Sequence, residues 1–141
     1  MSNAYYRPMS DNLFVHDLGA LANTMGAELI EATPLQVRMR LPVAGNTQPV
    51  GLLHGGANGV LIEHAGSILA SFHAPEGRIP VGTELSVSQL RSALTGHVTA
   101  TATVLSEGRS SFCAQVHVRD DAGVLTAAGR LTAVYVRNPG A

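Results

Sequence analysis

Residues 48–74 read QPVGLLHGGANGVLIEHAGSILASFHA, and this stretch decides the fold. From Ala57 onward, apolar residues recur at helical spacing, which predicts a helix that ends near His73 or Ala74. The apolar face of this helix consists of Ala57, Val60, Leu61, His64, Ala65, Ile68, Leu69 and Phe72. The opposite face carries the small residues Gly59, Gly66 and Ala70, so we expect the helix to be buried nearly all round.

The segments before this helix predict a shorter helix, two strands and a loop. Residues 10–25 begin with the cap residues Ser10 and Asp11 and carry leucines at roughly helical spacing. Gly26 is placed to end this first helix. Residues 27–41 alternate between apolar and polar side chains around a Thr-Pro break, which predicts a hairpin of two strands. The region that follows is rich in Gly, Pro and Asn, which is typical of a loop.

Everything after residue 77 is strand-like. Alternating side chains and intervening turn residues predict four strands, at residues 81–90, 96–105, 111–119 and 124–137. We expect these four strands to form a meander. An antiparallel sheet that curls around one apolar helix satisfies the whole order, which gives an α+β fold in a single domain over residues 1–141.

The composition favours an oligomer. Of the 141 residues 45% are hydrophobic and only 13% are charged, whereas charged residues usually make up roughly a quarter of a soluble chain. So few charges would cover a monomer poorly, and we therefore expect a homo-oligomer with a sizeable apolar interface.

The charges exclude several classes of function. The nine basic residues are all Arg and oppose ten acidic residues, so the net charge of −1 disfavours nucleic acid as a partner. The absence of Lys excludes amine nucleophiles and a P-loop. The lone cysteine, Cys113, cannot form an internal disulfide, which favours a reducing compartment. No apolar run is typical of a signal peptide or of a membrane helix, so we expect a cytoplasmic protein without a membrane partner.

The start of the long helix carries the residues with chemical potential. His54-Gly55-Gly56 leads into the helix, where free backbone N–H groups and the helix dipole suit a carbonyl oxygen that becomes an oxyanion. Glu63 is an ionisable group in the middle of the least polar helix, where we expect it to be buried. Ser67 lies one turn later on the same face and is placed to bond to Glu63 or to a water.

Each of these features also has a structural interpretation. The two glycines form a tight turn in many proteins, a lone histidine at a helix start is often a structural hydrogen-bonding group, and Glu63 alone is compatible with an exposed kink or an Arg pair. Taken together, a Gly-Gly helix start and an acid in the same helix match what acyl transfer requires, namely a group that polarises the electrophile and a base or nucleophile.

The His-Gly-Gly motif, the acid nine residues after the histidine and the order of elements resemble the hotdog-fold acyl-CoA thioesterases of the PaaI-like group. Glu63 resembles the branch of 4-hydroxybenzoyl-CoA and 1,4-dihydroxy-2-naphthoyl-CoA thioesterases. The resemblance implies that Gln48 and His54 hold the substrate side of the loop and that the Gly55 N–H polarises the thioester carbonyl. It also implies that Glu63 is the base or nucleophile and that Ser67 orients Glu63 or a water.

The resemblance further implies a shared site and a coenzyme A subsite. In this family two subunits join their sheets edge to edge, so that the acid of one faces the histidine loop of the other; this implies a homodimer or, as a dimer of dimers, a homotetramer. Gly82 resembles the segment that passes the pantetheine arm. Gln89 stands where the naphthoyl branch often has a histidine, and the resemblance implies that it too contacts the substrate. The residues that match contacts to the nucleotide end are Arg91, Ser110, Ser111 and Arg137, with Arg109 as a rival.

Hydrolysis of a small acyl- or aroyl-CoA is therefore the predicted function, with coenzyme A as part of the substrate and no separate cofactor. A hotdog dehydratase and a thioester-binding subunit without activity are the two alternatives. The sequence around Ser67 lacks the second glycine of a Gly-x-Ser-x-Gly elbow, so a Ser-His-Asp hydrolase is not expected. The histidines are scattered without metal-ligand spacing, so no metal site is expected.

Overall fold

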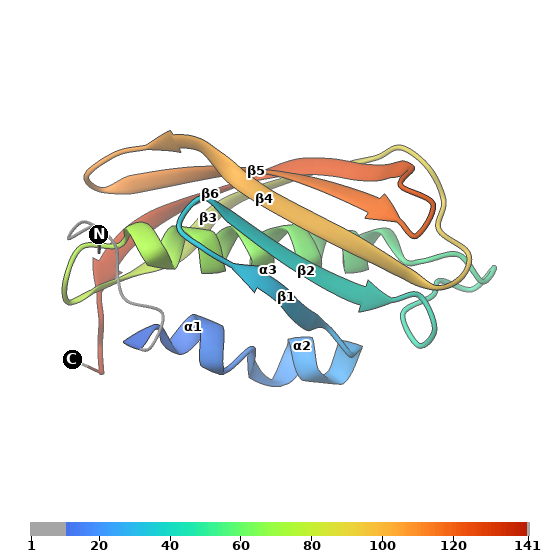
Figure 1. Ribbon diagram of the computed structural model, residues 1–141, viewed down its shortest axis with the longest axis horizontal. Helices are drawn as coiled ribbons and strands as arrows, with labels where there is room; N and C mark the ends of the chain where they lie inside the picture. Colours follow the sequence, from blue (N-terminus) through green and yellow to red (C-terminus); the bar gives the residue numbers. More distant parts are fainter. Residues whose placement is uncertain (1–10, 141) are drawn as a thin grey trace.

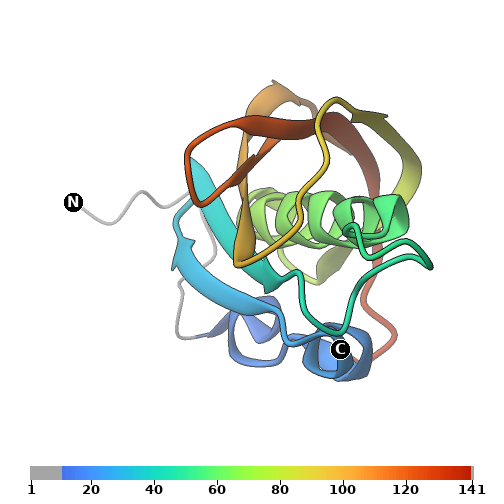
Figure 2. The same cartoon turned by 90° about the vertical axis from the view of Figure 1, so that its right-hand side faces the viewer.

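The computed structural model describes residues 11–140. One six-stranded antiparallel sheet curls around a single long helix, and two short helices lie across the side that the sheet leaves open (Figures 1 and 2). In chain order the elements are α1 (Leu13–His16), α2 (Gly19–Met25), β1 (Glu28–Ala32), β2 (Gln36–Pro42), α3 (Gly55–His73), β3 (Arg78–Gln89), β4 (His97–Glu107), β5 (Ser111–Asp120) and β6 (Leu125–Arg137).

The α3 helix confirms the predicted central helix and begins two residues earlier than Ala57. It begins at Gly55 because the His54 side chain caps it: Nδ1 of His54 accepts a hydrogen bond from the Gly56 N–H at 2.8 Å. The helix ends at His73, as predicted, and the chain then turns into β3. Five of the six strands, β2 to β6, pack against α3, so it forms the centre of the hydrophobic core.

One side of α3 is not covered by the sheet, which corrects the expectation of a helix buried nearly all round. Val60, His64 and Ser67 are half-buried, and Glu63 is exposed. These four residues follow one another at helical spacing and form what we call the open stripe of α3. The prediction that Glu63 is buried is therefore wrong for the single chain, because a sheet that curls around a helix leaves one side of it free.

The sheet order is β1-β2-β4-β5-β6-β3. The strands at 96–105, 111–119 and 124–137 form the predicted meander, but the strand at 81–90 does not join it: β3 pairs with β6 at the far edge. Short turns link β4 to β5 and β5 to β6, whereas the connection over residues 90–96 is longer and crosses the start of α3 (Figure 2). The Ala93 carbonyl accepts a hydrogen bond from the Leu53 N–H at 2.9 Å in this crossing.

The N-terminal region confirms the hairpin of β1 and β2 and corrects the first helix. The single helix predicted over residues 10–25 is two short helices, because Asp17 takes an extended conformation and its carboxylate accepts the Gly19 N–H at 2.8 Å. Asn12 provides the cap of α1 instead of Asp11, while Ser10 lies outside the described residues. Gly26 ends α2 in the left-handed conformation, as predicted.

The small residues of α3 let the helix lie close to the sheet. A Cβ atom built on Gly66 would lie 2.9 Å from the Cβ atom of Leu131 on β6, which is closer than real atoms approach. A Cβ atom on Gly59 would lie 3.7 Å from Val87, an ordinary contact. The two glycines therefore differ in function, since only Gly66 is required by packing.

Gly66→Ala is expected to lower the free energy of unfolding by about 1–3 kcal/mol, because the added methyl group overpacks the contact with Leu131. Gly59→Ala is the matched control in the same helix, where the methyl group fits and the gain in helix propensity adds up to about 1 kcal/mol. Urea denaturation of both variants measures the difference. Equal shifts for the two variants would contradict this view of the packing.

Candidate active site

The loop before α3 is a tight structure that places Gln48 and His54. Thr47 and Leu53 form a β-bridge, and the Gln48 N–H donates to the Leu52 carbonyl at 2.8 Å. The His54 N–H donates to the Asn46 carbonyl at 2.9 Å. The Gln48 side chain accepts the Val50 N–H at 2.6 Å, so its amide oxygen stabilises the loop in this structure.

The capping bond fixes the chemistry of His54. A neutral imidazole carries its proton on one nitrogen, and because Nδ1 accepts the Gly56 N–H, Nε2 carries the proton. The Gly55 N–H is in the first turn of α3 and finds no hydrogen-bond acceptor within residues 11–140. Two donors, the Nε2–H of His54 and the N–H of Gly55, are thus available at the positive end of the α3 dipole.

Gln89 and Asn58 support this turn from behind. The Gln89 side chain donates from Nε2 to the Gly55 carbonyl at 2.8 Å, and its Oε1 accepts from Nδ2 of Asn58 at 2.9 Å. A Cβ atom on Gly55 would lie 2.7 Å from Nε2 of Gln89, so the absence of a side chain at Gly55 is what permits this bond. Both the oxygen and the nitrogen of the exposed Gln89 amide therefore bond within the protein, and the predicted contact of Gln89 to substrate stays a prediction.

Glu63 lies farther along α3, beside β3. Its Oε1 would be 2.9 Å from a Cβ atom on Gly82, so the glycine provides the space that the carboxylate occupies. The register of β3 with β6 shifts between Gly82 and Glu84, and the Thr83 hydroxyl donates to the Thr132 carbonyl at 3.2 Å. A small cavity of about 200 Å³ lies here, lined by Glu63 and by the bulged segment of β3.

The predicted catalytic residues, together with the predicted substrate-binding residues Gln89 and Arg91, fall into two places within one chain. Gln48, Gly55, Gln89 and Arg91 line a cavity of about 420 Å³ at the start of α3, next to His54. Glu63 and Ser67 lie on the open stripe. The eight-residue separation of Gly55 and Glu63 corresponds to about 12 Å along the helix axis.

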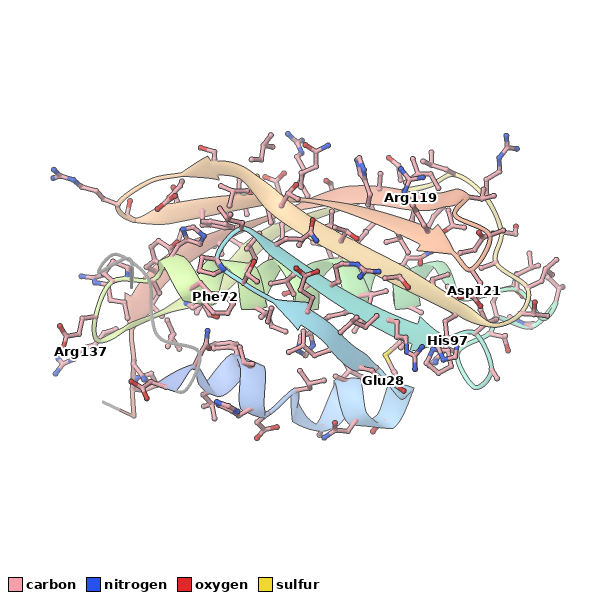
Figure 3. The ribbon with its side chains drawn as sticks, viewed as in Figure 1. Glu28, Phe72, His97, Arg119, Asp121 and Arg137 are labelled. Carbon is pink, nitrogen blue, oxygen red and sulfur yellow. The ribbon has the colours of Figure 1, made fainter. Side chains whose placement is uncertain are left out.

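The residues predicted to contact the nucleotide end of coenzyme A lie at opposite ends of the molecule. Arg91 follows β3 at the end where α3 begins. Ser110 and Ser111 lie at the turn between β4 and β5, and Arg137 ends β6, which is the end where α3 finishes. Figure 3 shows Arg137 at one end and His97 with Asp121 at the other. One chain therefore does not bring these four residues together.

A third and larger cavity, of about 520 Å³, lies between the open stripe and the helices α1 and α2. Its walls are mainly apolar, and Glu63, His64 and Ser67 line its α3 side. Burial lowers the pKa of His64, and the neighbouring Glu63 carboxylate opposes this effect more weakly. Sequence reasoning identified Glu63 and Ser67 but missed this cavity, because its two walls, α1 with α2 and the open stripe of α3, are distant from each other in the chain.

Sequence reasoning also missed Asn58 and Asn46. Asn58 is a buried polar residue whose Oδ1 has no hydrogen-bond partner among the described residues. The Asn46 side chain donates to the Met25 and Pro42 carbonyls, both at 2.8 Å, and so fixes the loop to the end of α2. Asn58 could have been found in the sequence, because it is the one amide side chain in an otherwise apolar turn of the predicted helix.

Within residues 11–140 no group of three His, Cys, Asp or Glu side chains could hold a metal ion. In the same residues no helix is long and apolar enough to cross a membrane. Cys113 is half-buried on β5, where its Sγ accepts the Thr132 hydroxyl at 3.6 Å.

Gln89→Ala is expected to lower the free energy of unfolding by about 1–2 kcal/mol, because two hydrogen bonds are lost and the buried Asn58 amide loses its partner. Gln115→Ala is the control, since Gln115 is an exposed glutamine on β5 and its loss should change stability by no more than about 0.5 kcal/mol. Urea denaturation compares the two variants. If Gln89→Ala is as stable as the control, the amide does not support the Gly55 turn.

Comparison with known proteins agrees with this geometry. The sequence pattern that defines the thioesterase superfamily matches residues 50–127. The chain is 36% identical over 119 residues to the proofreading thioesterase EntH of Cronobacter sakazakii, across 84% of this chain and 82% of the relative. It is 34% identical over 113 residues to a 1,4-dihydroxy-2-naphthoyl-CoA hydrolase of Listeria monocytogenes, across 79% of this chain and 92% of the relative.

Solved structures show the same fold. A thioesterase from Haemophilus influenzae has a TM-score of 0.85 at 28% identity, over 94% of both chains. A mutant thioesterase from Pseudomonas aeruginosa has a TM-score of 0.86 at 27% identity, over 96% of this chain and 100% of that one. The motif at the start of α3, the sheet that curls around it and the relatives all agree: the chain belongs to the thioesterase superfamily and is a hotdog-fold thioester hydrolase.

Proposed function

We propose that the enzyme hydrolyses a small acyl- or aroyl-CoA thioester to the free acid and coenzyme A, with the carbonyl oxygen bound by the Gly55 N–H. The observation that carries the proposal is this N–H, which points out of the first turn of α3 without an acceptor in residues 11–140. One preorganised donor of this kind typically stabilises an acyl-transfer transition state by about 3–4 kcal/mol. The Nε2–H of His54 is a second donor at the same end of the helix.

Glu63 is the acid that acts on the thioester carbon. As a general base it takes a proton from the attacking water, and the C–S bond breaks to release the coenzyme A thiolate, which takes up a proton. As a nucleophile the carboxylate itself displaces the coenzyme A thiolate and forms an anhydride, which water then hydrolyses to the free acid and the regenerated carboxylate. Ser67 lies one turn later on the open stripe and is placed to orient the carboxylate or the water. The carboxylate is exposed in the single chain, so a further wall is needed to exclude bulk solvent from the reaction.

A second copy of the chain supplies that wall. Reacting groups must come within about 3–3.5 Å of each other, whereas Gly55 and Glu63 of one chain lie about 12 Å apart along α3. β3 has a free edge, and Val81 and Leu85 on it are 43% and 39% exposed. A two-fold axis at this edge pairs β3 with its copy in antiparallel fashion, which brings the start of one α3 toward the middle of the other.

The same symmetry completes the coenzyme A subsite. Arg91 lies at one end of β3, while Ser110, Ser111 and Arg137 lie toward the other. Antiparallel pairing of two β3 edges brings Arg91 of one subunit to the end that carries Arg137 of its partner. Two guanidinium groups and the serine hydroxyls then face the phosphates together. The homodimer is the unit that completes a site, and a homotetramer would contain two such units.

The lone Cys113 fits a reducing compartment, so we place the enzyme in the cytoplasm.

Gly82 leaves room beside Glu63 for the pantetheine arm to pass along the bulge of β3.

Gly55→Pro tests the oxyanion donor, because proline removes the N–H while the first helical position is where a helix tolerates proline best. His54 already has the extended conformation that a following proline requires. Gly55→Ala is the matched control: it adds a Cβ atom with the same contact to Gln89 but keeps the N–H. The kcat of Gly55→Pro should be about 10²–10³-fold below that of Gly55→Ala in a free-thiol assay with acyl-CoAs. Equal kcat values would exclude this N–H from catalysis.

The shared site is tested by mixing two inactive variants. Glu63→Gln and Gly55→Pro should each be nearly inactive alone. If subunits are exchanged by unfolding and refolding, roughly half of the dimers are mixed and each mixed dimer holds one intact site, so roughly a quarter of wild-type activity should return.

Mass spectrometry under native conditions must show the mixed dimers, and Glu63→Gln refolded alone is the control. Mixed dimers without recovered activity would place both groups of each site in one chain. A protein that sediments as a 14.7 kDa monomer at working concentration would contradict the dimer itself.

A further inference from the structure

Asn58 is unfavourable in its place in α3 for two reasons. Asparagine is a poor residue for a helix interior, and an amide is costly to bury in an apolar core. Asn58 nevertheless lies between the buried residues Ala57 and Gly59 near the start of α3, and it is only 5% exposed. A residue that breaks two local rules at one position indicates a function beyond packing.

Three hydrogen bonds connect Asn58 to His54. Nδ2 of Asn58 donates to Oε1 of Gln89 at 2.9 Å, and Nε2 of Gln89 donates to the Gly55 carbonyl at 2.8 Å. That carbonyl belongs to the same planar peptide group as the Gly56 N–H, which donates to Nδ1 of His54 at 2.8 Å. These groups form what we call the amide network, which runs from the buried side of α3 to the exposed His54.

The chemistry of the groups determines the direction of every bond in the amide network. A backbone carbonyl only accepts, so the nitrogen of Gln89 must face Gly55 and its oxygen must face Asn58. Asn58 must therefore present its nitrogen to Gln89, and its Oδ1 has no hydrogen-bond partner among the described residues. Because all the donors point toward His54, each bond polarises the next one. The neutral imidazole at the end of the network carries its proton on Nε2.

Asn58 is the fixed end of the amide network. Gln89 ends β3 and is exposed, and the amide of an exposed glutamine rotates unless another group holds it. The buried Asn58 is held by the packing of α3 against the sheet. The orientation of the Gln89 amide is therefore set from inside the protein.

We propose that Asn58 is a positioning residue for thioester hydrolysis: it orients the Gln89 amide and, through the peptide group of Gly55 and Gly56, keeps His54 as a neutral donor from Nε2 to the thioester oxygen. The inference rests on the proposed function, in which His54 assists the Gly55 N–H. Asn58 acts through Gln89 and makes no contact to the reacting atoms in this scheme.

Asn58→Asp reverses the amide network with little change in side-chain size. A carboxylate has no donor, so the Gln89 amide must turn its Nε2 toward it, and Oε1 of Gln89 then faces the Gly55 carbonyl. These two oxygens repel each other, which tilts the peptide group and moves the Gly56 N–H out of line with His54. The kcat should fall at least about tenfold, but by less than the ~10²–10³-fold that follows loss of an oxyanion donor. KM should change by less than about twofold, because no contact to bound substrate is removed.

The pH dependence of Asn58→Asp is a second readout. When the introduced carboxyl is protonated it regains a donor for Oε1 of Gln89. The ratio of its kcat to the wild-type kcat should therefore rise as the pH falls, and taking this ratio cancels the titration of Glu63. In the Gln89→Ala background, Asn58→Asp should cause no further loss of kcat, because its effect passes through Gln89.

Nitrogen-15 NMR of the ligand-free enzyme with labelled histidine measures the tautomer of His54 without any substrate. The His54 signals are assigned by their absence in His54→Asn. The neutral ring should carry its proton on Nε2 in the wild type, and the form with the proton on Nδ1 should appear in Asn58→Asp.

Gln89→Glu is the second variant, because it also places an oxygen against the Gly55 carbonyl but changes an exposed side chain. Gln115→Glu adds the same charge at an exposed glutamine of β5 and should keep the wild-type kcat and tautomer. Urea denaturation checks that each variant is folded. If Asn58→Asp does not fold, the tautomer in Gln89→Glu decides.

Four results would each overturn this inference and leave the proposed function intact. They are an unchanged His54 tautomer, an unchanged kcat in Asn58→Asp, a kcat ratio that does not depend on pH, and a loss of kcat that persists in the Gln89→Ala background. A wild-type enzyme that hydrolyses none of acetyl-CoA, hexanoyl-CoA and benzoyl-CoA would refute the proposed function, and with it the role of Asn58 in hydrolysis.

Discussion

The contact between the glycine side of α3 and the inner face of the sheet determines where every other group lies. Gly66 lets the helix approach Leu131 on β6 more closely than any larger residue permits. Because β2 to β6 all pack against this one helix, its rotation about its own axis is fixed. That rotation leaves the open stripe free of the sheet, and the stripe carries the acid, the serine and the imidazole.

Most of the architecture could be predicted from local patterns. The 3.6-residue period of α3 and the two-residue alternation of the strands follow from which side each residue buries, so their bounds were predicted to within three residues. The place of β3 could not be predicted in this way, since pairing with β6 depends on the path of residues 90–96 and not on the pattern within the strand. The break at Asp17 was not predicted for a related reason. The hydrogen bond from the Gly19 N–H to the Asp17 carboxylate interrupts the helix without changing the spacing of the apolar residues.

The candidate site shows the same division. The His-Gly-Gly turn and Glu63 lie in one helix and one sequence motif, so sequence reasoning found them. Its expectation of a buried Glu63 assumed that an apolar helix is covered on all sides, and the coverage in fact ends at the open stripe. Gln89 was predicted only to bind the substrate, and its hydrogen bonds to Gly55 and Asn58, which are 34 and 31 residues away in the chain, were not predicted. Contacts of this range appear only once the strands are arranged in space.

The far-edge position of β3 also has a consequence for how the protein folds. Arg78 pairs with Arg137 and Gln89 with Ala127, so this ladder joins residues 59 and 38 positions apart. The hairpins β1-β2, β4-β5 and β5-β6 close short loops, so their formation costs little chain entropy. β3 pairs only with β6 and therefore cannot join the sheet until β6 has formed. The strand whose free edge we assign to the dimer therefore completes the sheet late, and subunits can recognise each other only after the C-terminal strand has docked. Truncation of β6 would thus impair assembly indirectly, because β6 is the only strand that pairs with β3 among the described residues.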